Sequence, residues 1–216
     1  MFEISKTFEF SAAHSVFSQR LSKRWAKNAY PKCRRLPGHG HNYRLVVYLQ
    51  SEKLDSSQMV TDFGHLRWLK DFIGECFDHK LILSFEDPAF YVLLEKLGLL
   101  KNETFSLPVE GAQVEAVAVK EDYRLEKFNF KEMELSKFSS YTFVSFRYLG
   151  ETSTPEGDFY SRLIDGIAFF RGSPTSENLA RFFYYFVNEN IKPLGVKCSK
   201  VSIFETPSSC ATFGEV

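Results

Sequence analysis

Three histidines near the start of the chain have the residue type and spacing of metal ligands. His39 and His41 flank Gly40 at the beginning of an expected strand. Side chains two residues apart on a strand point to the same face, so both imidazoles could bind one ion. His14 follows small residues at the end of an earlier expected strand, and pairing of the two strands would bring it close. Three histidines with an open fourth position are typical of a catalytic zinc site.

Cys33 lies six residues before His39 and has the basic neighbours Lys32, Arg34 and Arg35. Positive neighbours favour the thiolate over the thiol. A thiolate near a metal site could act as a general base, a nucleophile or a fourth ligand. Its surroundings therefore make Cys33 a candidate catalytic residue.

Three further polar residues stand where expected elements end. Asp78 and His79 close the first expected helix, and from there both could reach a site, although His79 could instead only interact with the helix dipole. Glu205 ends a late strand. A carboxylate accepts two parallel N–H bonds, as the amidine-like edge of a pterin offers them. The alternative for Glu205 is an exposed acid at a strand end.

The elements that must position these residues follow from hydrophobic periodicity. Alternation predicts strands over 2–10 and 43–49, and Asp62 is the expected N-cap of a helix whose apolar residues recur every three or four positions up to Phe77. The middle of the chain shows a helical pattern over 88–100 and a strand over 141–149. Pro174, expected near position N1, opens another helix, and strands follow over 196–204 and 210–216. This order predicts an α+β fold.

Composition limits the classes of protein. The 216 residues are 44% hydrophobic and 25% charged, which is ordinary for a globular chain. No apolar run approaches the length of a membrane span, and the N-terminal residues do not resemble a signal peptide. The cysteines lack CxxC spacing, which predicts free thiols in the cytoplasm, with three of them buried as small hydrophobic residues: Cys76, Cys198 and Cys210.

A net charge of zero hides a local excess of positive charge. Between Ser11 and Ser51 there is no acidic residue but eight basic ones, namely Arg20, Lys23, Arg24, Lys27, Lys32, Arg34, Arg35 and Arg44. Such a stretch favours a phosphate-bearing ligand, although a solvated basic loop is the simpler interpretation. An RNA-binding role is disfavoured, because aromatic residues that could stack on bases, such as Trp25 and Tyr30, are sparse among these basic residues. We therefore expect no nucleic-acid partner.

Six segments in order resemble the 6-pyruvoyl-tetrahydropterin synthase and 6-carboxy-tetrahydropterin synthase family. They are FSAAH, Cys33-x5-HGHNY, MVTDFGHL, DHK, PTSENLA and FETP. The resemblance covers residues 1–83 and 173–216, and residues 84–172 look like an insertion into a single domain that spans 1–216. The family resemblance implies the tunnelling fold (T-fold), a four-stranded antiparallel sheet with two helices on one face. It also implies a homo-oligomer, trimeric or hexameric, with active sites at subunit interfaces.

The resemblance also implies roles for individual residues. It makes His14, His39 and His41 the ligands of a zinc ion and Cys33 the catalytic cysteine, with Asp78 and His79 assisting proton transfer. The same resemblance makes Glu205 the anchor of the pterin ring of 7,8-dihydroneopterin triphosphate. Thr175 and Glu177 become candidate substrate contacts, although by itself Glu177 resembles an acid of a first helical turn.

Two products are compatible with these motifs. The Cys-x5-His spacing resembles animal enzymes that form the pyruvoyl product for tetrahydrobiopterin. The DFG and FETPSSCATF segments resemble bacterial members with long insertions, which mostly form the carboxy product for queuosine and other 7-deazapurines. The expectation is the carboxy enzyme. A zinc- or pterin-binding homologue without turnover is the other alternative, and the presence of Cys33, Asp78, His79 and all three histidines argues against it.

Overall fold

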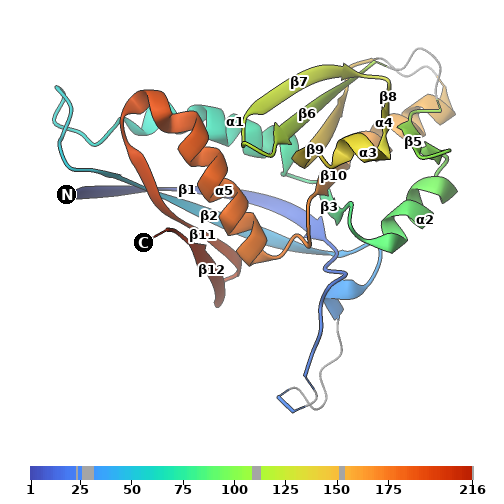
Figure 1. The fold of residues 1–216 in the computed structure, drawn as a ribbon, viewed down its shortest axis with the longest axis horizontal. Coiled ribbons are helices and arrows are strands. Elements are labelled where there is room, and N and C mark those ends of the chain that lie inside the picture. Colours follow the sequence, from blue (N-terminus) through green and yellow to red (C-terminus); the bar gives the residue numbers. More distant parts are fainter. Residues whose placement is uncertain (23, 26–31, 109–112, 151–153, 216) are drawn as a thin grey trace.

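A large mixed β-sheet runs through the molecule (Figure 1). The computed structural model describes all residues except 23, 26–31, 109–112, 151–153 and 216. Within the described residues the large sheet has nine strands in the order β12-β11-β2-β1-β3-β10-β9-β6-β7, and a second sheet has the order β4-β5-β8. No helix in this described part of the chain is long and apolar enough to cross a membrane.

One end of the sheet is the predicted four-stranded antiparallel unit. It consists of β1 (Phe2–His14), β2 (His39–Ser51), β11 (Lys197–Thr206) and β12 (Ser209–Phe213). The first two strands are longer than expected, because their pairing continues to the partners His14 and His39. This extension carries the strand ends as far as the candidate metal ligands.

Two helices cover one face of this unit, as expected. A 3-10 turn, η2 (Phe63–Leu66), leads into α1 (Arg67–Cys76), and Asp62 caps the turn by accepting the Gly64 N–H at 2.6 Å. The later helix, α5 (Ser176–Ile191), has Thr175 as its N-cap. Pro174 therefore precedes the cap and does not occupy N1, which corrects the expected start. The rings of Phe72 in α1 and Phe186 in α5 lie 4.5 Å apart, so both helices share one core.

The insertion extends the same sheet. Strand β3 (Leu81–Ser84) lies parallel to the end of β1, and β10 (Ile167–Phe170) lies parallel to β3. Antiparallel neighbours complete the sheet: β9 (Tyr141–Tyr148), β6 (Val114–Lys120) and β7 (Leu125–Phe130). Much of this segment lacked a clear pattern in the sequence, because strands buried on both faces do not alternate.

Short elements cover the insertion strands. The helix expected over 88–100 is α2 (Pro88–Lys96), and it ends early because Gly98 turns the chain at φ +71°. The remaining elements are η1 (Lys32–Arg34), β4 (Leu100–Lys101), β5 (Thr104–Ser106), β8 (Glu132–Glu134), α3 (Leu135–Phe138), α4 (Pro155–Asp165) and η3 (Lys192–Leu194).

Aromatic packing joins the insertion to the rest of the molecule. Phe77, which follows α1, is fully buried and stacks on Phe143 of β9 with the ring centroids 4.5 Å apart. The continuous sheet and this contact support the prediction of one domain over 1–216, which stays a prediction. Cys76 and Cys198 are buried as expected, whereas Cys210 is exposed because it lies on the edge strand β12.

Candidate metal centre and catalytic residues

The three histidines meet on the helix-covered face where β1 ends and β2 begins. His14 is paired with His39, and His41 is paired with Ala12, so the three imidazoles share one face of the two strands. Glu205, near the end of β11, completes the group. One ligand atom from each of these four residues lies within 4.8 Å of the others. Antiparallel pairing thus brings the three histidines together, as the sequence predicted.

Hydrogen bonding determines which nitrogen of His14 faces the cluster. Its Nδ1 lies 2.7 Å from the carbonyl oxygen of Pro174, and the Tyr43 hydroxyl lies 3.2 Å from the same nitrogen. Because a carbonyl oxygen can only accept, Nδ1 carries the proton and Nε2 presents its lone pair. Burial lowers the pKa of His14 and of His39, which favours the neutral imidazole that binds metals.

Two buried nitrogens of the cluster have no hydrogen-bond partner among the described residues, His39 Nδ1 and His41 Nε2. His41 Nε2 lies 2.9 Å from Glu205 Oε1, but the geometry of this contact is not that of a hydrogen bond. Buried polar atoms without partners are rare in folded proteins and call for an explanation. A cation bound to the carboxylate and to the ring nitrogens that face one another would satisfy His41 Nε2. It would not satisfy His39 Nδ1, because Nε2 is the nitrogen of His39 that faces His14.

The spacing of the donor atoms fits zinc. Tetrahedral ligands about 2.05 Å from a zinc ion lie about 3.3 Å from one another. In the cluster, His14 Nε2 lies 3.2 Å from His39 Nε2 and 3.7 Å from Glu205 Oε1. Three imidazoles with one carboxylate are also a donor set that zinc accepts. The residues present therefore fit a zinc ion.

Glu205 has a place that the sequence did not predict. Its Oε1 faces the histidines, and its Oε2 accepts a hydrogen bond of 2.7 Å from the Ser176 hydroxyl at the start of α5. Its expected role as a pterin anchor stays a prediction. Sequence reasoning also missed Tyr43, whose position two residues after His41 placed it on the same face.

Cys33 lies in η1 and is half-buried. Its backbone joins the loop to the chain after β1, because its N–H donates to the Gln19 side chain and its carbonyl accepts from the Val16 N–H. Burial raises the pKa of Tyr43, and the charges of Glu205 and Cys33 raise it further. In the described part of the chain Cys33 is not a member of the donor group, which favours a base or nucleophile over a ligand.

The basic residues of the loop are only partly described. Lys23, Lys27 and Tyr30, all considered in the sequence analysis, lie outside the described residues. Arg44 lies apart from that loop on β2, where its guanidinium stacks 3.9 Å from the centre of the Phe204 ring.

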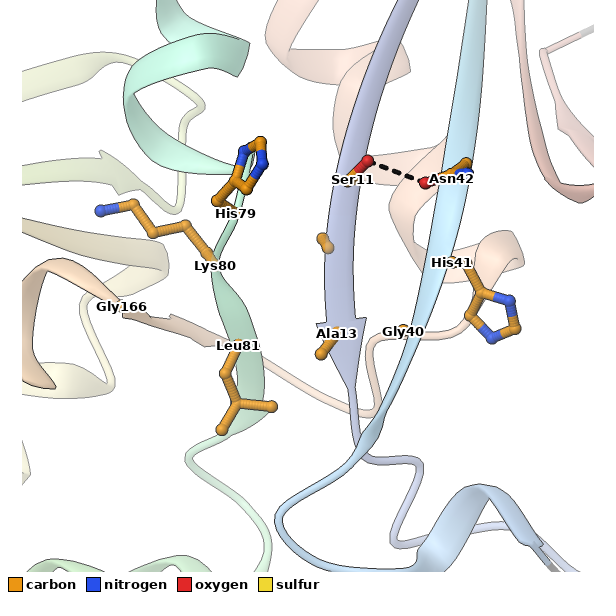
Figure 2. Close-up of a pocket in the computed structure, with 10 residues that line it drawn as sticks. Ser11, Ala13, Gly40, His41, Asn42, His79, Lys80, Leu81 and Gly166 are labelled. Atoms are coloured by element: carbon orange, nitrogen blue, oxygen red, sulfur yellow. Dashed lines mark hydrogen bonds between the residues drawn. The ribbon is translucent and has the colours of Figure 1, made fainter.

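Asp78 and His79 form a pair after α1. His79 Nδ1 lies 3.0 Å from Asp78 Oδ2, and Asp78 Oδ1 accepts the Ser11 N–H at 2.8 Å. Beside them is a cavity of about 460 Å³, lined by residues that include Ser11, Asn42 and His79. Figure 2 shows the His41 ring pointing away from His79, across the two strands. The described residues of one chain show no contact between this pair and the histidine cluster.

The two remaining predicted site residues lie at the start of α5. Thr175 caps the helix by accepting the Asn178 N–H at 3.3 Å. Glu177 is exposed in the first turn, where a negative charge suits the helix dipole. Their contacts with a substrate stay predictions.

The antiparallel four-stranded sheet, its two covering helices and the histidine cluster define a T-fold protein with a candidate metal centre. The chain belongs to the 6-pyruvoyl tetrahydropterin synthase family, whose model matches residues 3–215. The named relatives are tetrahydropterin synthases, so the chain belongs to a family of enzymes of the lyase class, as predicted.

Two relatives match along their whole length. The 6-carboxy-5,6,7,8-tetrahydropterin synthase of Aquifex aeolicus is 33% identical over 226 residues, covering 99% of this chain and 98% of the relative. The crystal structure of an uncharacterized protein from Wolinella succinogenes is 29% identical, with a TM-score of 0.71 and coverage of 100% and 98%. The human 6-pyruvoyl tetrahydrobiopterin synthase is 33% identical over 79 residues, 36% of this chain and 54% of the relative. The first two matches include the insertion, which is therefore not peculiar to this chain.

Proposed function

We propose that the chain is a zinc-dependent 6-carboxy-5,6,7,8-tetrahydropterin synthase. It converts 7,8-dihydroneopterin triphosphate and one water molecule to 6-carboxytetrahydropterin, acetaldehyde and triphosphate, in the cytoplasm, for queuosine and other 7-deazapurines. The observation that carries this proposal is the cluster of His14, His39, His41 and Glu205, in which the buried His41 Nε2 lacks a hydrogen-bond partner among the described residues. The relative of the same length that bears this name supports the carboxy product.

The chain's own residues supply binding and proton transfer. A zinc ion in the cluster would act as a Lewis acid toward the hydroxyl groups of the substrate's side chain. Pro174 and Tyr43 hold His14 in the orientation that such binding needs. The Cys33 thiolate removes a proton from the side chain, and the basic residues around it attract the triphosphate.

We further propose that a second copy of the chain completes the site. Asp78 and His79 would relay the proton that Cys33 removes, yet in the described residues of one chain they do not contact the cluster. A homo-oligomer, trimeric or hexameric, would bring this pair from one copy to the cluster of its neighbour.

The alternative product is 6-pyruvoyl-tetrahydropterin, formed from the same substrate by elimination of triphosphate. Two observations favour it, the six-residue step from Cys33 to His39 and the partial match to the human 6-pyruvoyl tetrahydrobiopterin synthase. Loss of turnover with retained zinc binding is the third possibility.

The test is mass spectrometry of the products after the zinc-loaded protein is incubated with 7,8-dihydroneopterin triphosphate. The carboxy product with acetaldehyde is the expected result, and a pyruvoyl product would instead establish the alternative. Unconsumed substrate in the presence of bound zinc would overturn both proposed activities, the carboxy and the pyruvoyl synthase.

A further inference from the structure

Lys80 is a buried cation between the Asp78–His79 pair and the insertion. Only 8% of its surface is exposed. Its ammonium donates to the carbonyl oxygen of Phe146 in β9 at 3.2 Å and to that of Asp165 at the end of α4. Burying an ammonium is costly unless its hydrogens are bonded, so the carbonyl oxygens are essential partners. Burial lowers the pKa of Lys80, and the negative charge of Asp165 opposes this effect.

The segment that contains the pair is held from two sides. Toward β1, the His79 N–H donates to the Ser11 carbonyl at 2.6 Å, and the Lys80 carbonyl accepts the Ala13 N–H at 2.9 Å. Toward the insertion, the Leu81 N–H donates to the Gly166 carbonyl at 2.7 Å, next to the carbonyl that binds the Lys80 ammonium. Figure 2 shows the Lys80 side chain running away from Ser11.

His79 needs this support because its backbone is strained. Its φ of +59° lies in the left-handed region, which residues other than glycine rarely adopt. Such a conformation persists only where the surrounding contacts enforce it. The side chain of His79 is nevertheless 83% exposed, so the backbone and the contact with Asp78 determine where the imidazole lies.

We propose that Lys80 is a positioning residue that attaches the Asp78–His79 pair to the insertion and thereby sets the direction of the His79 imidazole. The insertion acts through the carbonyl groups of residues 146 and 165, which hold the Lys80 ammonium in place. This inference rests on the proposed function for its kinetic consequence, whereas the attachment itself can be tested without turnover.

The test compares Lys80→Met with Lys127→Met. Both changes remove a cation that joins the insertion to the rest of the molecule, since the Lys127 ammonium lies 2.9 Å from Glu75. In the described residues Lys127 makes no contact with residues 78–81, so it is a matched control. In Lys80→Met we expect kcat to fall at least tenfold, while KM and zinc content stay within twofold of wild type. Lys127→Met should leave all three within twofold.

Amide hydrogen exchange provides the readout that does not need turnover. The Ser11 and His79 amides should exchange at least tenfold faster in Lys80→Met and at the wild-type rate in Lys127→Met. Unchanged exchange in a folded Lys80→Met protein would overturn the proposal, as would an unchanged kcat. If wild type consumes no substrate, the proposed function is wrong and the exchange rates alone decide the role of Lys80.

Asp165→Asn is the milder variant should Lys80→Met fail to fold. An asparagine oxygen still accepts the Tyr148 N–H, which Asp165 binds at 2.6 Å, but the negative charge near the ammonium is lost. A kcat lowered about threefold at constant KM, with faster exchange at His79, supports the proposal. Wild-type kcat and exchange in Asp165→Asn would contradict it.

Discussion

The change Glu205→Gln separates a metal ligand from a substrate anchor. In the structure Glu205 Oε1 lies 2.9 Å from His41 Nε2 and 3.7 Å from His14 Nε2, close to the separation of about 3.3 Å between two ligands of one zinc ion. Glutamine preserves the size of the side chain and a bonding partner for the Ser176 hydroxyl. The change therefore removes the negative charge from the cluster and little else.

The expected loss of zinc affinity follows from this geometry. Mutating even the residues that only orient zinc ligands weakens binding about 10- to 100-fold. The distances from Glu205 Oε1 to two histidine nitrogens are close to the separation of two ligands on one zinc ion. We therefore expect Glu205→Gln to weaken zinc binding within this range, which equals about 1.4–2.7 kcal/mol. The charge that Glu205 contributes is what makes the effect this large, since glutamine still offers a neutral oxygen.

Competition with a chromophoric chelator at neutral pH measures the zinc affinity directly. Glu177→Gln is the matched control, because it removes an exposed carboxylate at the start of the same helix, α5, from a residue outside the donor group. Its zinc affinity should equal that of wild type. If Glu205→Gln binds zinc within twofold of wild type while KM rises, Glu205 is a substrate contact alone and the argument from donor distances is wrong.

Three further predictions concern catalysis and stability. Cys33→Ala should retain zinc and lose at least about 100-fold in turnover, since a general base contributes that much, and an unchanged rate would exclude the assigned role. Phe77→Ala should lower the free energy of unfolding by about 3–5 kcal/mol in denaturant titrations, because its ring is fully buried against Phe143, whereas Leu125→Ala at an exposed position should cost less than about 0.5 kcal/mol. Burial raises the pKa of Glu75, but Lys127 and Arg147 lower it more, so its stabilising contribution is present at neutral pH and is lost as the pH falls below 4.5. Glu75→Gln should therefore lower the free energy of unfolding by about 1 kcal/mol at neutral pH and make the melting temperature less dependent on acid pH. Equal pH profiles of the variant and the wild type would refute this.

Local patterns were sufficient to predict strands of the antiparallel unit and the meeting of the three histidines, whereas the four-stranded arrangement followed from the family resemblance. Alternation identified β1 and β2, and the HxH spacing placed His39 and His41 on one face before any contact was known. The N-cap at Asp62 was correct for the same reason, since capping depends on a few neighbouring residues. The ends of the strands were predicted less well, because pairing with a partner strand extends β1 as far as His14.

The insertion shows where local patterns fail. Among the described residues β3 pairs with β1 at Ala13 and His14, and β10 returns to pair with β3 from the far end of the insertion. Strands inside a sheet that is covered on both faces lose the alternation that marks an amphipathic strand. Their assignment depends on partners far away in the sequence, which periodicity does not encode.

The sequence by itself determined which residues of this protein are candidates for chemistry, because histidine, cysteine and carboxylate side chains are the groups that bind metals and transfer protons. Only the tertiary structure decided which of them meet. Glu205 joins the histidines because β11 pairs with β2, whereas Asp78 and His79 are attached to the other side of β1 through Ser11. Lys80 is buried because the insertion folds over it. Each of these contacts joins segments far apart in the chain. Strand pairing and side-chain packing between distant segments stabilise them, and a local sequence pattern does not encode either.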